Sequence, residues 1–184
     1  RATATLPADI DPMRTMPLRI NLALGTGDVA TALAGAKEVI AAGHVEARPS
    51  ELATATGAAF AWAGLPEEAR AALAIALVRT QAEHRVTAHA MALVAGAVVD
   101  YHSAGDEAAC AAAQRAIDFA TSSGLGEYHG IAPAVAIRAV TCPSDTATAD
   151  AERAVVLARR ATTMLGLVFV LTVAGDVLLQ QGDD

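Results

Sequence analysis

Residues 57–69 of the chain read GAAFAWAGLPEEA, and this stretch decides the fold. Its second glycine, Gly64, allows a sharp turn, and the proline and two glutamates that follow are typical of a new helix start. A bulky residue, Phe60, stands four positions before Gly64, and a small residue, Ala69, stands five positions after it. The stretch therefore predicts two antiparallel helices, with Phe60 filling the space between neighbouring pairs and Ala69 letting two backbones approach.

The same arrangement returns along the chain. Turn glycines fall at Gly27, Gly64, Gly105 and Gly182, with a further turn near residues 144–146, and the first three are 37 and 41 residues apart. In an all-helical sequence, a period of about 34–45 residues is typical of helix pairs that stack side by side. The period therefore predicts a helical-repeat protein.

Equivalent positions of these units carry similar residues. The position five residues after the turn glycine is small in three units, where it holds Ala32, Ala69 and Cys110. Gly57 and Gly175 each stand seven residues before a turn glycine. We expect both to permit close approach of a neighbouring helix, because glycine has no side chain.

The composition agrees with an all-α fold and argues against a function in nucleic-acid binding. Of 184 residues, 54% are apolar, 3% are aromatic and 47 are alanine, which is the best helix former. Few aromatic residues argue against a β-sandwich or barrel. A net charge of −7 with scattered arginines argues against direct contact with nucleic acid, which requires a positive surface.

Helix boundaries follow from the capping and turn residues. Asp28 and Ser50 are expected as helix N-caps. The nine expected helices cover residues 12–24, 28–42, 50–62, 66–82, 85–102, 106–121, 131–140, 147–163 and 165–181. They form units of about 12–43, 49–82, 85–122, 127–163 and 165–184, in one domain over residues 1–184.

Three features of the sequence bear on the domain context and the cellular location of the protein: its ends, its apolar runs and its cysteines. The chain starts without an initiator methionine and stops at residues 182–184, where a new helix would begin, so we expect a fragment of a longer multidomain protein. The apolar run at residues 164–175 is shorter than the ~20 residues of a membrane helix. Cys110 and Cys142 are expected as two separate, buried thiols, in agreement with a cytoplasmic location.

The units resemble a known repeat family. Residues 57–69 occupy the positions of the tetratricopeptide repeat (TPR) in the pattern G-x-x-F-x-x-x-G-x-x-x-x-A, and residues 98–110 are the next best match. The early tryptophan of the family is absent, and the unit that contains Pro133 has no turn glycine. Over essentially the whole chain, this TPR-like resemblance implies a right-handed superhelix, or α-α solenoid, of antiparallel helix pairs.

Longer, alanine-rich units of this kind are similar to the superhelical sensor region of large ATP-binding LuxR-family (MalT-like) bacterial transcriptional regulators. The phrases at residues 101–106 and 151–161 carry this likeness. It implies an ATP-binding module and a DNA-binding helix-turn-helix elsewhere in the parent chain, because neither motif occurs here. We expect a ligand- or protein-binding regulatory module without catalysis. The alternatives are a protein-interaction scaffold outside transcription and a helical enzyme with an unrecognised site.

Other constellations favour structural roles. Residues 124–130 are glycine-rich, but their spacing differs from that of a dinucleotide loop and no strand precedes them, so we interpret them as an inter-helix loop. His84 and His89 are five residues apart and face different sides of a helix. Residues 102–106 hold serine, histidine and aspartate without a nucleophile elbow. We therefore expect no metal, cofactor or catalytic residue.

The concave face is the remaining candidate site, since the first helix of each pair lines the inner surface of a superhelix. Its positions carry mostly polar side chains and the only tryptophan: Arg14, Asn21, Glu51, Thr54, Trp62, His102, Asp176 and Gln180. These residues are expected to bind a protein segment or a small-molecule effector. The alternatives are that they form a solvated face, and that Trp62 packs between repeats. Exposed terminal repeats also predict a possible homodimer.

Overall fold

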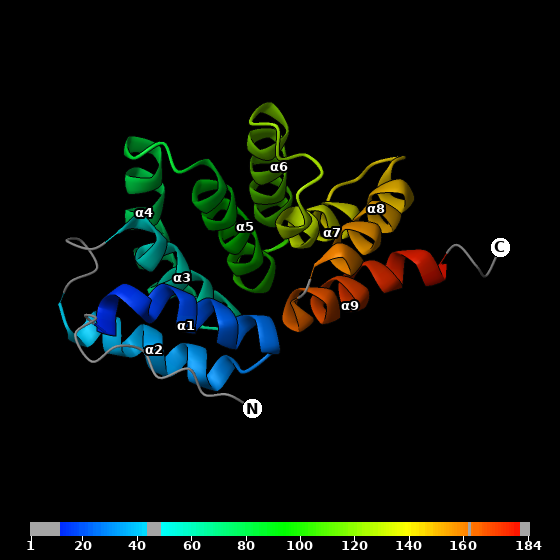
Figure 1. The fold of residues 1–184 in the computed structure, drawn as a ribbon. Helices are drawn as coiled ribbons and strands as arrows, with labels where there is room; N and C mark the ends of the chain where they lie inside the picture. Colours follow the sequence, from blue (N-terminus) through cyan, green and yellow to red (C-terminus); the bar gives the residue numbers. More distant parts are fainter. Residues whose placement is uncertain (1–11, 44–48, 162, 181–184) are drawn as a thin grey trace.

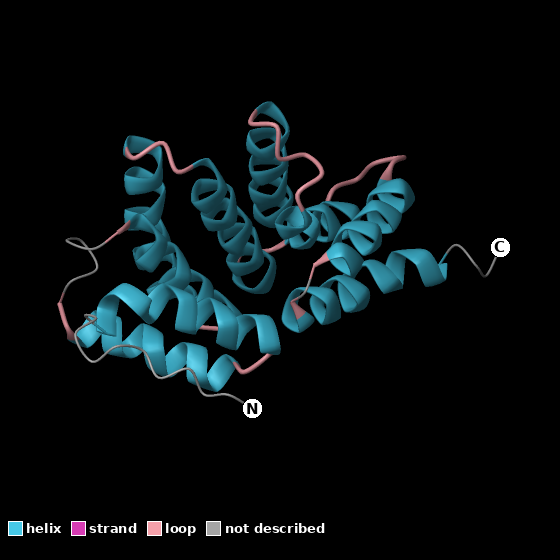
Figure 2. Cartoon of the chain, viewed as in Figure 1, coloured by secondary structure: helices cyan, strands magenta, loops and turns pink. Residues whose placement is uncertain are grey.

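The computed structural model describes residues 12–43, 49–161 and 163–180. Over these residues the chain forms nine α-helices and one 3₁₀ turn, with no strand (Figures 1 and 2). The all-α prediction is therefore confirmed. The elements are α1 (Pro12–Thr26), α2 (Val29–Ala41), α3 (Ser50–Trp62), α4 (Pro66–Ala82), α5 (Val86–Ser103), α6 (Asp106–Ser122), η1 (His129–Ile131), α7 (Ala132–Thr141), α8 (Ala147–Arg160) and α9 (Met164–Gln180).

Local signals position the helix ends. The Asp28 carboxylate accepts a hydrogen bond from the Thr31 N–H at 3.0 Å, as expected of an N-cap. Hydrogen bonding from Thr31 lowers the pKa of Asp28. Gly27, Gly64 and Gly105 have φ values of 80°, 71° and 85°, so they make the expected sharp turns. The turn predicted at residue 182 lies outside the described residues.

One capping prediction is wrong. Pro49 occupies the N-cap position of α3, and Ser50 is the first helical residue. The Ser50 hydroxyl donates instead to the Glu83 carboxylate at 2.7 Å, and this bond is the main cause of a lowered pKa of Glu83. Because Glu83 ends α4, the serine fastens the start of α3 to the end of its neighbour.

The helices pack in a regular order. Each helix contacts the next one along the chain, and the odd-numbered helices also contact each other in succession, from α1 to α3, α5, α7 and α9. The odd-numbered helices thus form an inner row, while the even-numbered helices lie along its outside (Figure 1). The row curves so far that α1 also contacts α9.

Two hydrophobic clusters form the core. The N-terminal cluster consists of buried residues of α1 to α4 and one face of α5, and the C-terminal cluster extends from another face of α5 to α9. Gly57 of α3 lies in the N-terminal half, where an added Cβ would stand 2.6 Å from the Leu73 side chain, so the expected close approach is confirmed. At Gly175 an added Cβ would meet nothing within 4 Å among the described residues, but the turn predicted for that unit at residue 182 lies outside them, so the same prediction stays untested there.

The prediction of two separate thiols is also wrong. Cys110 of α6 and Cys142, which follows α7, form a disulfide with a Cα–Cα distance of 5.2 Å. The residues are 32 positions apart, and only the packing of α6 against α7 brings them together. This pairing removes the argument from free cysteines to a reducing compartment.

None of the described helices combines the length and the apolar character that a membrane span requires.

Candidate functional site

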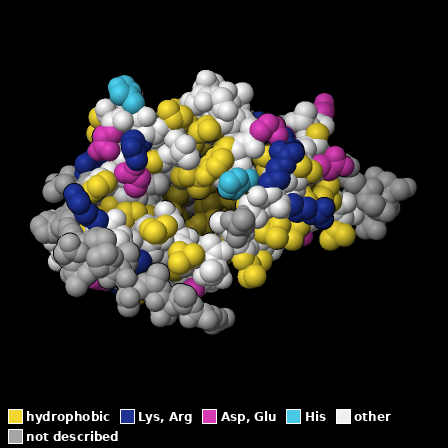
Figure 3. All heavy atoms as spheres, in the orientation of Figure 1, with side chains coloured by type: hydrophobic (Ala, Val, Ile, Leu, Met, Phe, Trp, Pro, Cys, Tyr) yellow, Lys and Arg dark blue, Asp and Glu magenta, His cyan; other side chains and the backbone are white. Residues whose placement is uncertain are grey.

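The inner row of helices surrounds a cavity of about 750 Å³. Figure 3 shows this face of the molecule hollowed at its centre, with hydrophobic side chains over most of the floor. Its walls come mainly from α1, α3, α5, α7 and α9, with Ala158 of α8, and from the segments before α5, before α7 and after α8. Residues far apart in the sequence therefore line one open hollow.

Helical spacing places small apolar residues on the cavity side of α3. Ala55, Ala58 and Trp62 follow one another at steps of three and four, so they lie on one face, and all three line the cavity. The two alanines extend no further than Cβ, which leaves the space open. On the facing wall, Met91 and Val98 of α5 stand two helical turns apart and also line the cavity.

Trp62 both packs against another helix and lines the cavity. Its ring lies edge-on to the Phe169 ring of α9, with centroids 5.2 Å apart, and it packs against both hydrophobic clusters. The same side chain lines the cavity. It also lines a second hollow of about 460 Å³ together with His102. Trp62 is thus a packing residue between α3 and α9 that forms part of the cavity wall.

Charged side chains meet at one edge of the cavity. Glu51 of α3 and Arg85, in the turn before α5, form an ion pair and both line the cavity. His84 stands beside them and adopts a φ of 52°, which closes the turn. Deeper in α3, the buried Thr54 hydroxyl donates to the Ser50 carbonyl at 3.0 Å. This edge therefore presents an ion pair and neutral polar groups.

The opposite wall is the segment that leads into α7. The Tyr128 and His129 rings contact each other with centroids 4.6 Å apart, and both residues line the cavity. An added Cβ at Gly130 would collide with the Tyr128 ring and lie 2.7 Å from the Met91 Sδ. Glycine at this position thus allows the segment to approach α5.

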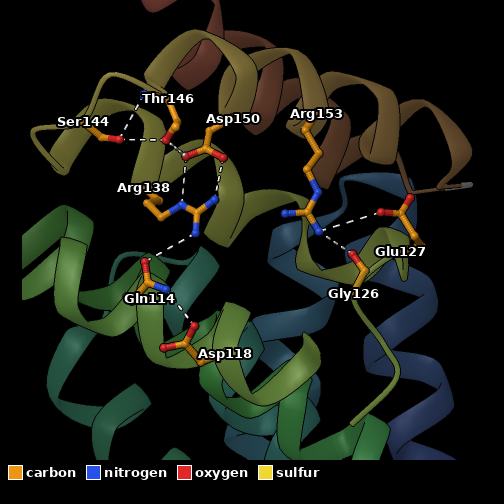
Figure 4. Close-up of polar contacts among 9 residues, drawn as sticks. All are labelled: Gln114, Asp118, Gly126, Glu127, Arg138, Ser144, Thr146, Asp150 and Arg153. Carbon is orange, nitrogen blue, oxygen red and sulfur yellow. Dashed lines mark hydrogen bonds and ion pairs between the residues drawn. The ribbon is translucent and has the colours of Figure 1, made fainter. Parts of the chain in front are cut away.

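Helix α8 holds the same segment from outside. The Arg153 guanidinium donates to the Gly126 carbonyl at 2.7 Å and lies 3.9 Å from the Glu127 carboxylate (Figure 4). Arg160 also pairs with Glu127, at 3.3 Å. These contacts fix the loop expected at residues 124–130, and they support the wall that carries Tyr128.

The larger polar cluster of Figure 4 is a structural connection between helices. The Arg138 guanidinium of α7 donates two hydrogen bonds to the Asp150 carboxylate of α8, one of them from Nε at 2.9 Å, and a third to Gln114 of α6. Thr146 also donates to Asp150, at 3.4 Å, and bonds to Ser144. Because these groups bond to one another and line neither hollow, they are not candidate ligand contacts.

The structure distributes the eight residues predicted on the concave face as follows. Asn21, Glu51, Thr54 and Trp62 come together around the cavity. His102 lines the second hollow with Trp62. Arg14 and Asp176 are exposed and line neither hollow, and the side chain of Gln180 lies outside the description.

Sequence reasoning missed most of the cavity residues; five examples are His84, Arg85, Met91, Tyr128 and His129. Four of these five lie outside the first helices of the pairs as the structure has them, and the prediction was restricted to those helices. The one available signal was the length of the loop between the predicted helices 106–121 and 131–140, which holds the adjacent pair Tyr128 and His129.

Two other kinds of site could be suggested from the sequence, a serine–histidine–aspartate set at residues 102–106 and a metal site. The Ser103 hydroxyl donates to the Val99 carbonyl at 2.7 Å and accepts from Arg70 at 2.8 Å. Across the three described stretches, no three His, Cys, Asp or Glu side chains gather as metal ligands would.

Comparison with known proteins assigns no family: no protein-family model, no curated protein and no solved structure matches the chain.

Proposed function

We propose that this chain is a ligand-binding regulatory module in which helix pairs form a right-handed superhelix around a small-molecule effector. The cavity at the centre of the inner row carries the proposal. Its volume of about 750 Å³ falls within the range of about 300–1,000 Å³ that is usual for small-molecule sites. The largely apolar lining with a few polar groups is also typical of such sites.

The likeness to the sensor region of LuxR-family regulators supplies a cellular context for this proposal. In that context the module acts in the cytoplasm and passes a signal to an ATP-binding module and a DNA-binding helix-turn-helix of the parent chain. It binds its effector without converting it.

The contact between α1 and α9 supports a mechanism. Leu24 of α1 and Leu165 of α9 both line the cavity, as does Val94 of the central helix α5. A ligand between them would contact the first, middle and last helices of the inner row at once. It would therefore stabilise one curvature of the row over others, which shifts the population of conformations.

A cavity-filling substitution tests the proposal. The probe is the uncharged amine N-phenylnaphthylamine, whose fluorescence rises in apolar surroundings. Ala58→Phe should weaken its binding at least about tenfold, because the ring would occupy the cavity. The matched control is Ala71→Phe on α4, where the alanine is exposed and lines neither hollow.

Circular dichroism and thermal melting should show both variants folded, with the control binding the probe like the natural chain. Failure of the natural chain to bind the probe, or equal binding by folded Ala58→Phe, would contradict a ligand cavity. Should Ala58→Phe not fold, Ala58→Leu provides a smaller filling at the same partly buried position.

One observation favours a second function, that of a protein-interaction scaffold. Helix α9 exposes four large apolar side chains, namely Met164, Val168, Leu171 and Leu179. Exposed apolar surface of this kind is typical of protein interfaces, including those of homodimers. Light scattering decides between the functions: a monomer that binds the probe supports the ligand module, and a stable dimer without probe binding supports the scaffold.

A further inference from the structure

We infer that the cavity selects an uncharged, mainly apolar small molecule with a hydrogen-bonding group, and that it discriminates against an ion of the same size. This inference rests on the proposed function, because it names the class of effector that the same cavity would take. It follows from three features of the lining: the floor, the charges and the neutral polar side chains.

The apolar floor and walls require an apolar ligand body. They include side chains without charge or hydrogen-bonding groups, among them Leu24, Ala58, Val94, Val98 and Pro133. A polar group placed against this surface would lose its bonds to water without replacement, which costs free energy. An apolar group would instead gain from its removal from water.

With the imidazoles of His84 and His129 counted as neutral, the charges of the lining cancel. Among the described residues around the cavity, the only Asp, Glu, Lys or Arg side chains are Glu51 and Arg85, and these two pair with each other. A bound anion would meet a guanidinium whose charge Glu51 already balances, and a bound cation would meet a carboxylate whose charge Arg85 already balances. Without either partner, an ion would leave water uncompensated, which is costly.

Neutral polar side chains remain for one hydrogen-bonding group of the ligand. The Asn21 amide, on α1, offers both a donor and an acceptor. Thr87 and Tyr128 contribute hydroxyl groups from other walls, and Thr54 keeps acceptor capacity although its hydroxyl proton is directed to Ser50. The cavity can therefore orient an alcohol, ketone or amide group on an apolar body.

Two probes that share one ring skeleton test this selectivity. N-phenylnaphthylamine is uncharged, and anilinonaphthalene sulfonate adds one negative charge to the same rings. The natural chain should bind the uncharged probe at least about tenfold more tightly than the sulfonate. Competition between the probes, followed by fluorescence, shows whether both occupy the same cavity.

Removing one member of the ion pair should change this ratio. Glu51→Gln frees the Arg85 guanidinium, so the affinity for the sulfonate relative to the uncharged probe should rise about two- to fivefold, as for a partly exposed ion pair. Arg85→Gln should lower the same ratio. The control is Glu67→Gln, which removes an exposed carboxylate of α4 that does not line the cavity and should leave the ratio unchanged.

The outcomes separate the two proposals. The selectivity is overturned if the natural chain binds both probes equally, or if Glu51→Gln does not change the ratio of the two affinities. The ligand cavity itself would still stand in that case, provided that Ala58→Phe weakens binding of the uncharged probe as predicted. Binding of neither probe would refute the ligand cavity itself, and the selectivity with it.

Discussion

The N-terminal and C-terminal clusters bury similar kinds of residue and differ in what connects their helices. Alanine makes up 12 of 20 buried members in the N-terminal cluster and 14 of 23 in the C-terminal cluster, so alanine content does not distinguish them. The larger buried side chains do distinguish the two clusters. In the N-terminal cluster, leucine, methionine and phenylalanine make up five of the eight larger members, whereas in the C-terminal cluster valine and isoleucine make up eight of nine.

Directional links are strongest in the C-terminal half. The Cys110–Cys142 disulfide joins α6 to the end of α7, and the Arg138–Asp150 pair joins α7 to α8. The corresponding ion pair of the N-terminal half is Arg70 with Asp100, whose side chains are 39% and 24% exposed. Those of Arg138 and Asp150 are only 19% and 8% exposed.

The comparison shows two ways to fix alanine-rich helices, each of which offers little side-chain surface for packing. One half relies on a few large apolar side chains, and the other adds a covalent bond and a buried ion pair. The cavity takes walls from both halves and from α5, which belongs to both clusters. Its shape therefore depends on both kinds of stabilisation.

The largest expected effect tests the two ion pairs against each other. Asp150→Ala should lower the free energy of unfolding by about 3–5 kcal/mol, because it leaves the Arg138 guanidinium without its partner in a mostly buried position. The matched variant Asp100→Ala should cost at most about 1 kcal/mol, since Arg70 remains accessible to water. Urea denaturation measures both values, and equal losses would remove the distinction between the halves.

The next effect concerns the disulfide. Cys110→Ser with Cys142→Ser should lower the free energy of unfolding by about 3–4 kcal/mol, because the cross-link restricts the unfolded chain over a separation of 32 residues. Dithiothreitol should destabilise the natural chain by a similar amount and leave the double variant unchanged. Two reactive thiols in the folded, untreated protein would show instead that the cysteines are not paired.

Features that depend on neighbouring residues in the sequence were predicted well. The Asp28 cap, the turn at Gly64 and most helix boundaries rest on a few adjacent residues, and the structure agrees with them, the boundaries to within two residues. The end expected for the helix at residues 147–163 is wrong, because Ala161 is extended and α8 ends at Arg160.

Ser50 shows the limit of such reasoning. Its hydroxyl was expected to cap the N-terminus of α3, which is an equally local role. Instead, Glu83, 33 residues away in the sequence, lies close enough to accept its hydrogen bond.

Features that depend on contacts between units were predicted in part. The repeat period identified inner-row positions, and so it found Asn21, Glu51, Thr54 and Trp62 of the cavity lining. It could not find residues in turns, whose length changes between units. The disulfide was missed for the same reason, since only the packing of two helices brings its cysteines together.

The smallest effect tests how tightly the N-terminal half is packed. Gly57→Ala places a Cβ 2.6 Å from the Leu73 Cγ and 3.3 Å from the Leu73 backbone nitrogen, so α4 must shift. Overpacking of this kind costs about 1–3 kcal/mol. The control is Gly96→Ala in α5, where an added Cβ meets no described atom within 4 Å and the better helix propensity of alanine should add about 0.5–1 kcal/mol of stability. In thermal or urea denaturation, Gly57→Ala should lower the stability and Gly96→Ala should raise it. A stabilising Gly57→Ala would mean that α3 and α4 do not pack as closely at Leu73 as the structure shows.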